Sequence, residues 1–111
     1  MSVDLARVLE LHARLEGAPY GYGHKWPLSN TDLDVLKTRP VDCSGYVRYV
    51  LCHSGVNEFP DGSYAQRQYV RNILRGRPVE YEGLKYAVAD PTRLFIAFRP
   101  HSKTMPGHVW L

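Results

Sequence analysis

The hydrophobic residues near the start of the chain recur with the period of an α-helix. Between residues 4 and 16 they stand at positions i, i+3, i+4 and i+7, which predicts a helix with one buried face. The residues of that face are Leu5, Val8, Leu9, His12 and Leu15. The sequence Gly17-Ala18-Pro19 ends this pattern, because glycine and proline are poor helix formers.

Two further segments show the same period. A helix is predicted over residues 41–54, with a stripe formed by Tyr46, Val47, Val50 and Leu51. A third is predicted over residues 63–74, where Ser63 is a suitable N-cap. The stretch from 19 to 40 has no such period, so we expect an irregular loop that is anchored to the core by Leu33, Val35 and Leu36.

After Pro78 the pattern is typical of strands. Residues 79–82 alternate, residues 94–98 form a short apolar run, and residues 108–111 resemble the start of another strand. Helices followed by strands favour the α+β class. A length of 111 residues is typical of one domain, so residues 1–111 are expected to form a single unit.

Composition and charge narrow the function classes. Hydrophobic residues make up 44% of the chain and charged residues 23%, which excludes a disordered or coiled-coil protein. No apolar run approaches the roughly 20 residues that a membrane span needs, so no span is expected. The N-terminal segment lacks the basic-then-apolar layout of a signal peptide, which leaves the localisation open. The net charge of +3 suits contact with an anionic polymer but does not require one.

A row of arginines offers a separate hypothesis. Arg67, Arg71 and Arg75 have the i, i+4, i+8 spacing of one helix face, which could contact phosphate groups. A solvated surface face has the same spacing. We therefore expect no nucleic-acid partner, and nucleic-acid binding is only the weaker alternative.

The two cysteines have different expected roles. Within one helix, nine residues place Cys43 and Cys52 on opposite faces and roughly 13 Å apart, too far for a disulfide, which needs about 7 Å. Neither has the spacing of a zinc site, so no metal is expected. A helix N-terminus stabilises a thiolate, which makes Cys43 a candidate nucleophile, although a buried core cysteine is the alternative. Cys52 is expected to fill the core.

The histidines and two aromatic residues also have alternative interpretations. His108 opens a strand after Gly107, where its ring could serve a nucleophilic cysteine as a base, or could be structural. His12 is expected to be structural. Tyr22 and Trp26 are candidates for cleft aromatics that contact a substrate, although a core role is equally open for Trp26.

Taken together, several segments resemble the NlpC family of papain-like cysteine peptidases. The resemblance is carried by Gly17-Ala18-Pro19-Tyr20-Gly21-Tyr22-Gly23, Asp42-Cys43-Ser44-Gly45-Tyr46-Val47 and Gly107-His108-Val109, in the family's order. The segments 59–66 and 94–98 are similar to two further family segments, although Thr92-Arg93 stand where the family usually has Gly-Asp.

The resemblance implies a papain-like fold and amide hydrolysis in peptidoglycan stem peptides, commonly after D-γ-glutamate. Cys43 would be the nucleophile and His108 the base and then the acid. Tyr20 would help to stabilise the reacting carbonyl. Asp42 and Ser44 would line a substrate subsite that often receives a free amine. No metal or cofactor is implied.

Two further departures from the family change the expectation. The family usually has a third polar residue on the strand after the catalytic histidine, whereas this sequence ends three residues after His108. Either the domain is short at its C-terminus, or another group, with His24 and His101 as the candidates, orients the ring. A strand edge left open there would favour self-association. The alternative function is a catalytically incomplete module that binds cell wall or another anionic partner. The loop from 24 to 40 is also longer than is usual, which would narrow the cleft.

Overall fold

The helices of the chain come before its strands. The structure is a computed structural model that describes residues 3–76, 94–99 and 107–111. Its elements in chain order are α1 (Leu5–Leu15), α2 (Leu33–Leu36), α3 (Cys43–Cys52), α4 (Ser63–Asn72), β1 (Ala97–Arg99) and β2 (His108–Trp110). Because β1 and β2 pair antiparallel, the predicted α+β class is confirmed in this coarse form. The strand predicted over residues 79–82 lies outside the described residues.

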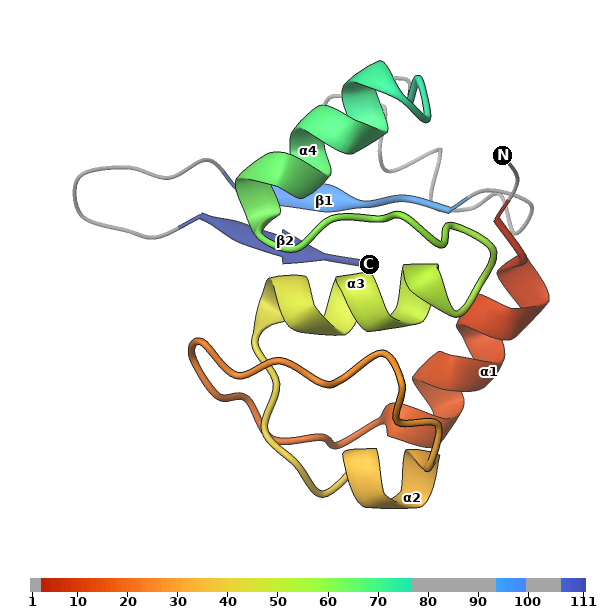
Figure 1. The fold of residues 1–111 in the computed structure, drawn as a ribbon, viewed down its shortest axis with the longest axis vertical. Coiled ribbons are helices and arrows are strands. Elements are labelled where there is room, and N and C mark those ends of the chain that lie inside the picture. Colours follow the sequence, from red (N-terminus) through yellow and green to blue (C-terminus); the bar gives the residue numbers. More distant parts are fainter. Residues whose placement is uncertain (1–2, 77–93, 100–106) are drawn as a thin grey trace.

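Helix α3 is the centre of the packing. Its N-cap is Asp42, whose carboxylate accepts a hydrogen bond from the backbone N–H of Gly45 at 2.7 Å. The side chains of Val47, Val50 and Leu51 are fully buried. Helix α3 packs on β2, and the two elements begin at the same end of the molecule (Figure 1). The first residues of both elements are thereby brought to one place.

The antiparallel pairing of the two short strands fixes the position of His108. Phe98 pairs with Val109, and Arg99 pairs with His108. Val109 is buried against the core, so the side chains on either side of it point to the opposite face of the strand. The strand predicted over residues 94–98 is observed at Ala97–Arg99 instead, so it begins three residues later and ends one residue later than predicted.

Helix α1 confirms the predicted helix but not the predicted face. Val8, Leu11 and Leu15 are buried, whereas Leu9 is 68% exposed. At 100° per residue, Leu9 stands about 100° away from Val8, while Leu11 returns to within about 60° of it. The prediction that Leu9 is buried was therefore wrong, and Leu11 takes its place.

Two other details differ from the predictions. The loop predicted over residues 19–40 contains the one-turn helix α2, which is capped by Asp32 and buries Leu33 and Leu36. Helix α4 is capped by Gly62 rather than by Ser63, and it ends at Asn72. Arg75 lies beyond that end with a positive φ of 53°, so it does not continue the arginine face of the helix.

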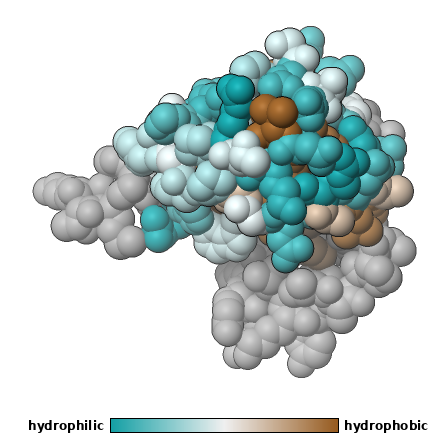
Figure 2. Space-filling model, turned by 90° about the horizontal axis from the view of Figure 1, so that it is seen from below, coloured by the Kyte–Doolittle hydropathy of each residue, from teal (hydrophilic) through white to brown (hydrophobic). Residues whose placement is uncertain are grey.

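The face of the molecule seen from below Figure 1 is mostly polar where its residues are described. Figure 2 shows this face as largely hydrophilic, with hydrophobic groups confined to small areas. Among the described residues, no helix is both long and apolar enough to cross a membrane.

Candidate active site

A short parallel bridge holds Tyr20 beside the start of α3. Tyr20 and Val41 form the bridge, in which the Gly21 N–H donates to the carbonyl of Val41 and the Val41 N–H donates to the carbonyl of Pro19, both at 3.1 Å. The Asp42 N–H donates to the carbonyl of His24 at 2.8 Å. The loop that follows α1 is thus fixed against the residue that precedes Cys43.

Two adjoining cavities meet at Cys43. The larger has a volume of about 650 Å³ and the smaller about 320 Å³. Both are lined by the same four predicted site residues, namely Tyr20, Asp42, Cys43 and His108. The smaller cavity also includes the other two, Tyr22 and Ser44. The fold therefore gathers six residues that are up to 88 positions apart in the sequence, from Tyr20 to His108.

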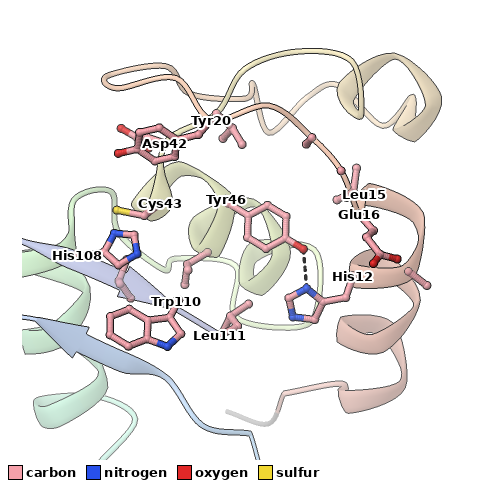
Figure 3. Close-up of a pocket in the computed structure, with 16 residues that line it drawn as sticks. His12, Leu15, Glu16, Tyr20, Asp42, Cys43, Tyr46, His108, Trp110 and Leu111 are labelled. Carbon is pink, nitrogen blue, oxygen red and sulfur yellow. Dashed lines mark hydrogen bonds between the residues drawn. The ribbon is translucent and has the colours of Figure 1, made fainter.

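The sulfur of Cys43 and the ring of His108 face one another. Figure 3 shows the Cys43 side chain, at the first turn of α3, directed toward the imidazole at the start of β2. Both side chains are half-buried, so they are open to the cavities but sheltered on one side. A thiol beside an imidazole has the components of a nucleophile and its base.

The described neighbour of the His108 ring is aromatic. The centroid of the His108 ring lies 5.1 Å from the centroid of the Trp110 ring, and the two rings are inclined by 31°. Among residues 3–76, 94–99 and 107–111, no side-chain hydrogen bond to the imidazole is observed. Of the two residues expected as replacements, His24 lines neither cavity, and His101 lies outside the described residues.

Tyr20 presents a hydroxyl group at this junction. Its side chain is 61% exposed. Partial loss of solvent raises the pKa of Tyr20, and the neighbouring acidic groups Cys43 and Asp42, whose ionised forms are negative, raise it further. The hydroxyl therefore keeps its proton at neutral pH and is available as a hydrogen-bond donor.

An ion cluster lies behind Asp42. The Nζ of Lys25 is 2.7 Å from each carboxylate oxygen of Asp42, 2.7 Å from the Ser44 hydroxyl and 2.9 Å from a carboxylate oxygen of Asp61. Partial burial alone would lower the pKa of Lys25, but the hydrogen bonds and charges of Asp42 and Asp61 raise it above its ordinary value. Lys25 is therefore a permanent cation at this position.

Gly45 leaves the space through which Lys25 reaches its partners. A Cβ atom on Gly45 would lie 2.7 Å from Oδ1 of Asp42 and 2.9 Å from Cδ of Lys25. Both distances are shorter than the van der Waals contact distance of these atoms. The glycine after Ser44 is thus needed for close packing rather than for an unusual backbone conformation.

Gln66 connects α4 to α3 next to Cys43. It is fully buried, and its side-chain amide donates to the carbonyl of Ser44 at 2.8 Å and to that of Pro60 at 3.0 Å. Its Oε1 has no hydrogen-bond partner among the described residues. These two bonds hold the turn before α4 against the first turn of α3.

A second polar pair lies in the wall of the larger cavity. Nδ1 of His12 is 2.5 Å from the hydroxyl of Tyr46, and the two rings are 5.5 Å apart (Figure 3). Burial lowers the pKa of His12 and raises the pKa of Tyr46 to about 12. Both side chains are therefore neutral at physiological pH, and the pair adds polarity to this wall without charge.

The two remaining candidates are part of the packing. Trp26 is buried, and its indole N–H donates to the carbonyl of Arg39 at 3.2 Å, so the interpretation as a cleft aromatic was wrong. Cys52 lies half-buried at the other end of α3, with its sulfur 3.5 Å from the carbonyl of Phe59. Among the described residues, no group of three His, Cys, Asp or Glu side chains could hold a metal ion.

Sequence reasoning missed three of these features. Lys25 and Asp61 are ordinary loop residues in the sequence, and no spacing predicts the ion pairs of Lys25 with Asp42 and Asp61. Gln66 belongs to the segment 59–66 that resembles a family segment, so its position was noted but not its role. The pairing of His12 with Tyr46 depends on how α1 crosses α3, which no local pattern shows.

Comparisons with protein-family models, with curated proteins and with solved structures found no match for this chain.

Proposed function

We propose that the chain is a cysteine hydrolase that cleaves amide bonds in peptidoglycan stem peptides, with a papain-like arrangement of its helices and sheet. The observation that carries this proposal is the meeting of Cys43 and His108 at the junction of two cavities (Figure 3). The order of the sequence motifs supports the same chemistry. The choice of a γ-D-glutamyl peptide as substrate depends on the resemblance to the NlpC family.

In the proposed reaction, His108 accepts the thiol proton as the sulfur of Cys43 attacks the amide carbon. The imidazolium then protonates the leaving amine, and a thioester remains on Cys43. Water attacks this thioester with His108 as the base, which releases the acid and restores the thiol.

The developing oxyanion needs hydrogen-bond donors. Tyr20 lines both cavities beside Cys43, and its hydroxyl carries a proton at neutral pH, as its raised pKa further favours. The unpaired N–H groups at the start of α3 provide a further positive potential. Tyr20 is therefore assigned to transition-state stabilisation.

The test is hydrolysis of purified stem peptides, followed by mass spectrometry of the products and of the protein. We expect a thioester adduct on Cys43 under rapid quenching and no turnover by Cys43→Ala. Cys52→Ala is the matched control, and its turnover should remain within about threefold of wild type, because Cys52 lines neither cavity. Loss of activity in Cys52→Ala at unchanged stability would contradict the assignment of the nucleophile.

A second candidate function is a non-catalytic wall-binding module of the same fold. The observation that favours it is the aromatic contact of His108 with Trp110, which fixes the ring less directionally than a hydrogen bond would. This candidate predicts that isolated sacculi retain wild type and Cys43→Ala equally, while neither protein releases peptide fragments.

A further inference from the structure

The ammonium group of Lys25 has all three of its N–H donors in use. Its partners are the carboxylate of Asp42, the hydroxyl of Ser44 and the carboxylate of Asp61, each 2.7–2.9 Å away. No donor of Lys25 is left for a ligand, and both carboxylate oxygens of Asp42 and the hydroxyl of Ser44 already contact this internal cation.

This cluster forms the back of the smaller cavity. Asp42 and Ser44 line that cavity together with Cys43, whereas Lys25 lines neither cavity. A carboxylate with 11% of its side chain exposed would attract a cation from the cavity if it were alone. With Lys25 bound to it, the charge of Asp42 is compensated before any ligand arrives, and the remaining carboxylate of the cluster, Asp61, lines neither cavity.

The surrounding packing holds the arrangement in place. The backbone N–H of Gly45 also donates to Oδ1 of Asp42 at 2.7 Å, so the carboxylate cannot turn without loss of the helix cap. The stem of Lys25 crosses the helix where Gly45 has no Cβ atom. The lysine position is therefore a feature of the packed first turn of α3 rather than of a freely moving surface side chain.

We propose that Lys25 is a specificity-determining residue that fills, from inside the protein, the position where Asp42 and Ser44 would otherwise bind a substrate ammonium group. The smaller cavity then takes an uncharged part of a peptide, such as an amide-linked or acylated residue, in preference to a free amino terminus. The identity of the ligand as a peptide rests on the proposed function. The amine subsite expected from the family resemblance is thereby replaced by a neutral one.

The test measures how charge affects modification of Cys43 and does not need hydrolysis. Two thiol reagents are compared in a Cys52→Ala background, the cationic 2-(trimethylammonium)ethyl methanethiosulfonate and the neutral methyl methanethiosulfonate. In both reactions the thiolate attacks the sulfenyl sulfur, a disulfide forms and methanesulfinate leaves. The ratio of the two rates is divided by the same ratio for N-acetylcysteine.

We expect a normalised ratio of at most about three when Lys25 is present, since Asp61 leaves the cluster with one excess negative charge. For Lys25→Met we expect a further rise of about tenfold, the scale of one unit charge removed at short range in a partly screened site. Lys37→Met is the matched control, because Lys37 lies at the end of α2 and its replacement removes one positive charge at a different place. Its ratio should equal that of wild type.

Asp61→Asn provides an independent arm, since Asp61 is 45% exposed at its side chain and its loss need not disturb folding. The normalised ratio should fall below wild type, because one anion of the cluster is removed while Lys25 stays. A ratio of tenfold or more in the wild type, or equal ratios in wild type, Lys25→Met and Asp61→Asn, would overturn the proposal. The assay requires only that the reagents reach Cys43. Its outcome therefore does not depend on whether the protein hydrolyses peptides.

Discussion

The side-chain amide of Gln66 donates a hydrogen bond of 2.8 Å to the carbonyl of Ser44, the residue that follows Cys43. Through this bond a fully buried residue of α4 supports the first turn of α3, where the candidate nucleophile lies. The support is internal to the fold, so it can be tested by stability as well as by chemistry.

Gln66→Ala should destabilise the protein by about 2–4 kcal/mol, because the carbonyls of Ser44 and Pro60 lose their donor and a cavity remains. The free energy of unfolding in urea measures the effect. Gln68→Ala is the control on the same helix, with an expected change within about 0.5 kcal/mol. Equal stabilities of the two variants would contradict the role given to Gln66.

Gly45→Ala should destabilise the protein by about 1–3 kcal/mol, although alanine is the better helix former by about 1 kcal/mol. The reason is that the new Cβ atom would lie 2.7 Å from Oδ1 of Asp42. Thermal and urea unfolding measure the change. Ala65→Gly, at an exposed position of α4, reports propensity alone and should destabilise by about 1 kcal/mol. Stabilisation by Gly45→Ala would show that propensity, not packing, decides at this position.

The two thiols should differ in reactivity. Burial raises the pKa of Cys52, whereas Cys43 lines two cavities. With iodoacetamide near pH 7.5, we expect Cys43 to be alkylated at least about tenfold faster, since the thiolate is the reacting form. Peptide mapping by mass spectrometry gives both rates. Similar rates at the two positions would remove the basis for treating Cys43 as an accessible nucleophile.

Tyr20→Phe should lower kcat/KM for stem-peptide hydrolysis by about 10²-fold, the scale for loss of one oxyanion donor, with little change in KM. Tyr64→Phe is the control, because Tyr64 is 77% exposed on α4 and lines neither cavity. If both variants retain wild-type kcat/KM, Tyr20 is not part of the reaction.

His12 should make stability depend on pH. Burial lowers its pKa in the folded state, so below about pH 6.5 the unfolded chain binds more protons than the folded chain. The free energy of unfolding should therefore fall as the pH drops through this range. His12→Gln removes the titration while keeping an acceptor for Tyr46, and its loss of stability on acidification should be smaller. His24→Gln, in an exposed loop, is the control and should follow wild type. A steeper acid dependence for His12→Gln than for wild type would contradict this assignment.

Local patterns in the sequence determined most of the helical half and identified the residues of the candidate site. The helix at Cys43 is specified by Asp42 as its cap and by an apolar period of 3.6, both of which act within a few residues. The motifs around Tyr20, Cys43 and His108 likewise lie at predictable ends of elements. All six candidate site residues were therefore named from sequence, although their roles remain predictions.

Tertiary structure decided what local patterns cannot encode. Whether Leu9 or Leu11 is buried depended on the side from which α3 approaches α1, and the burial of Trp26 depended on the path of its loop. The bonds from Lys25 to Asp42 and Asp61 join residues that are 17 and 36 positions apart, so they exist only once the loops have packed on α3. An ion pair of this kind is set by distance in space, and sequence spacing beyond one helical turn contains no information about that distance.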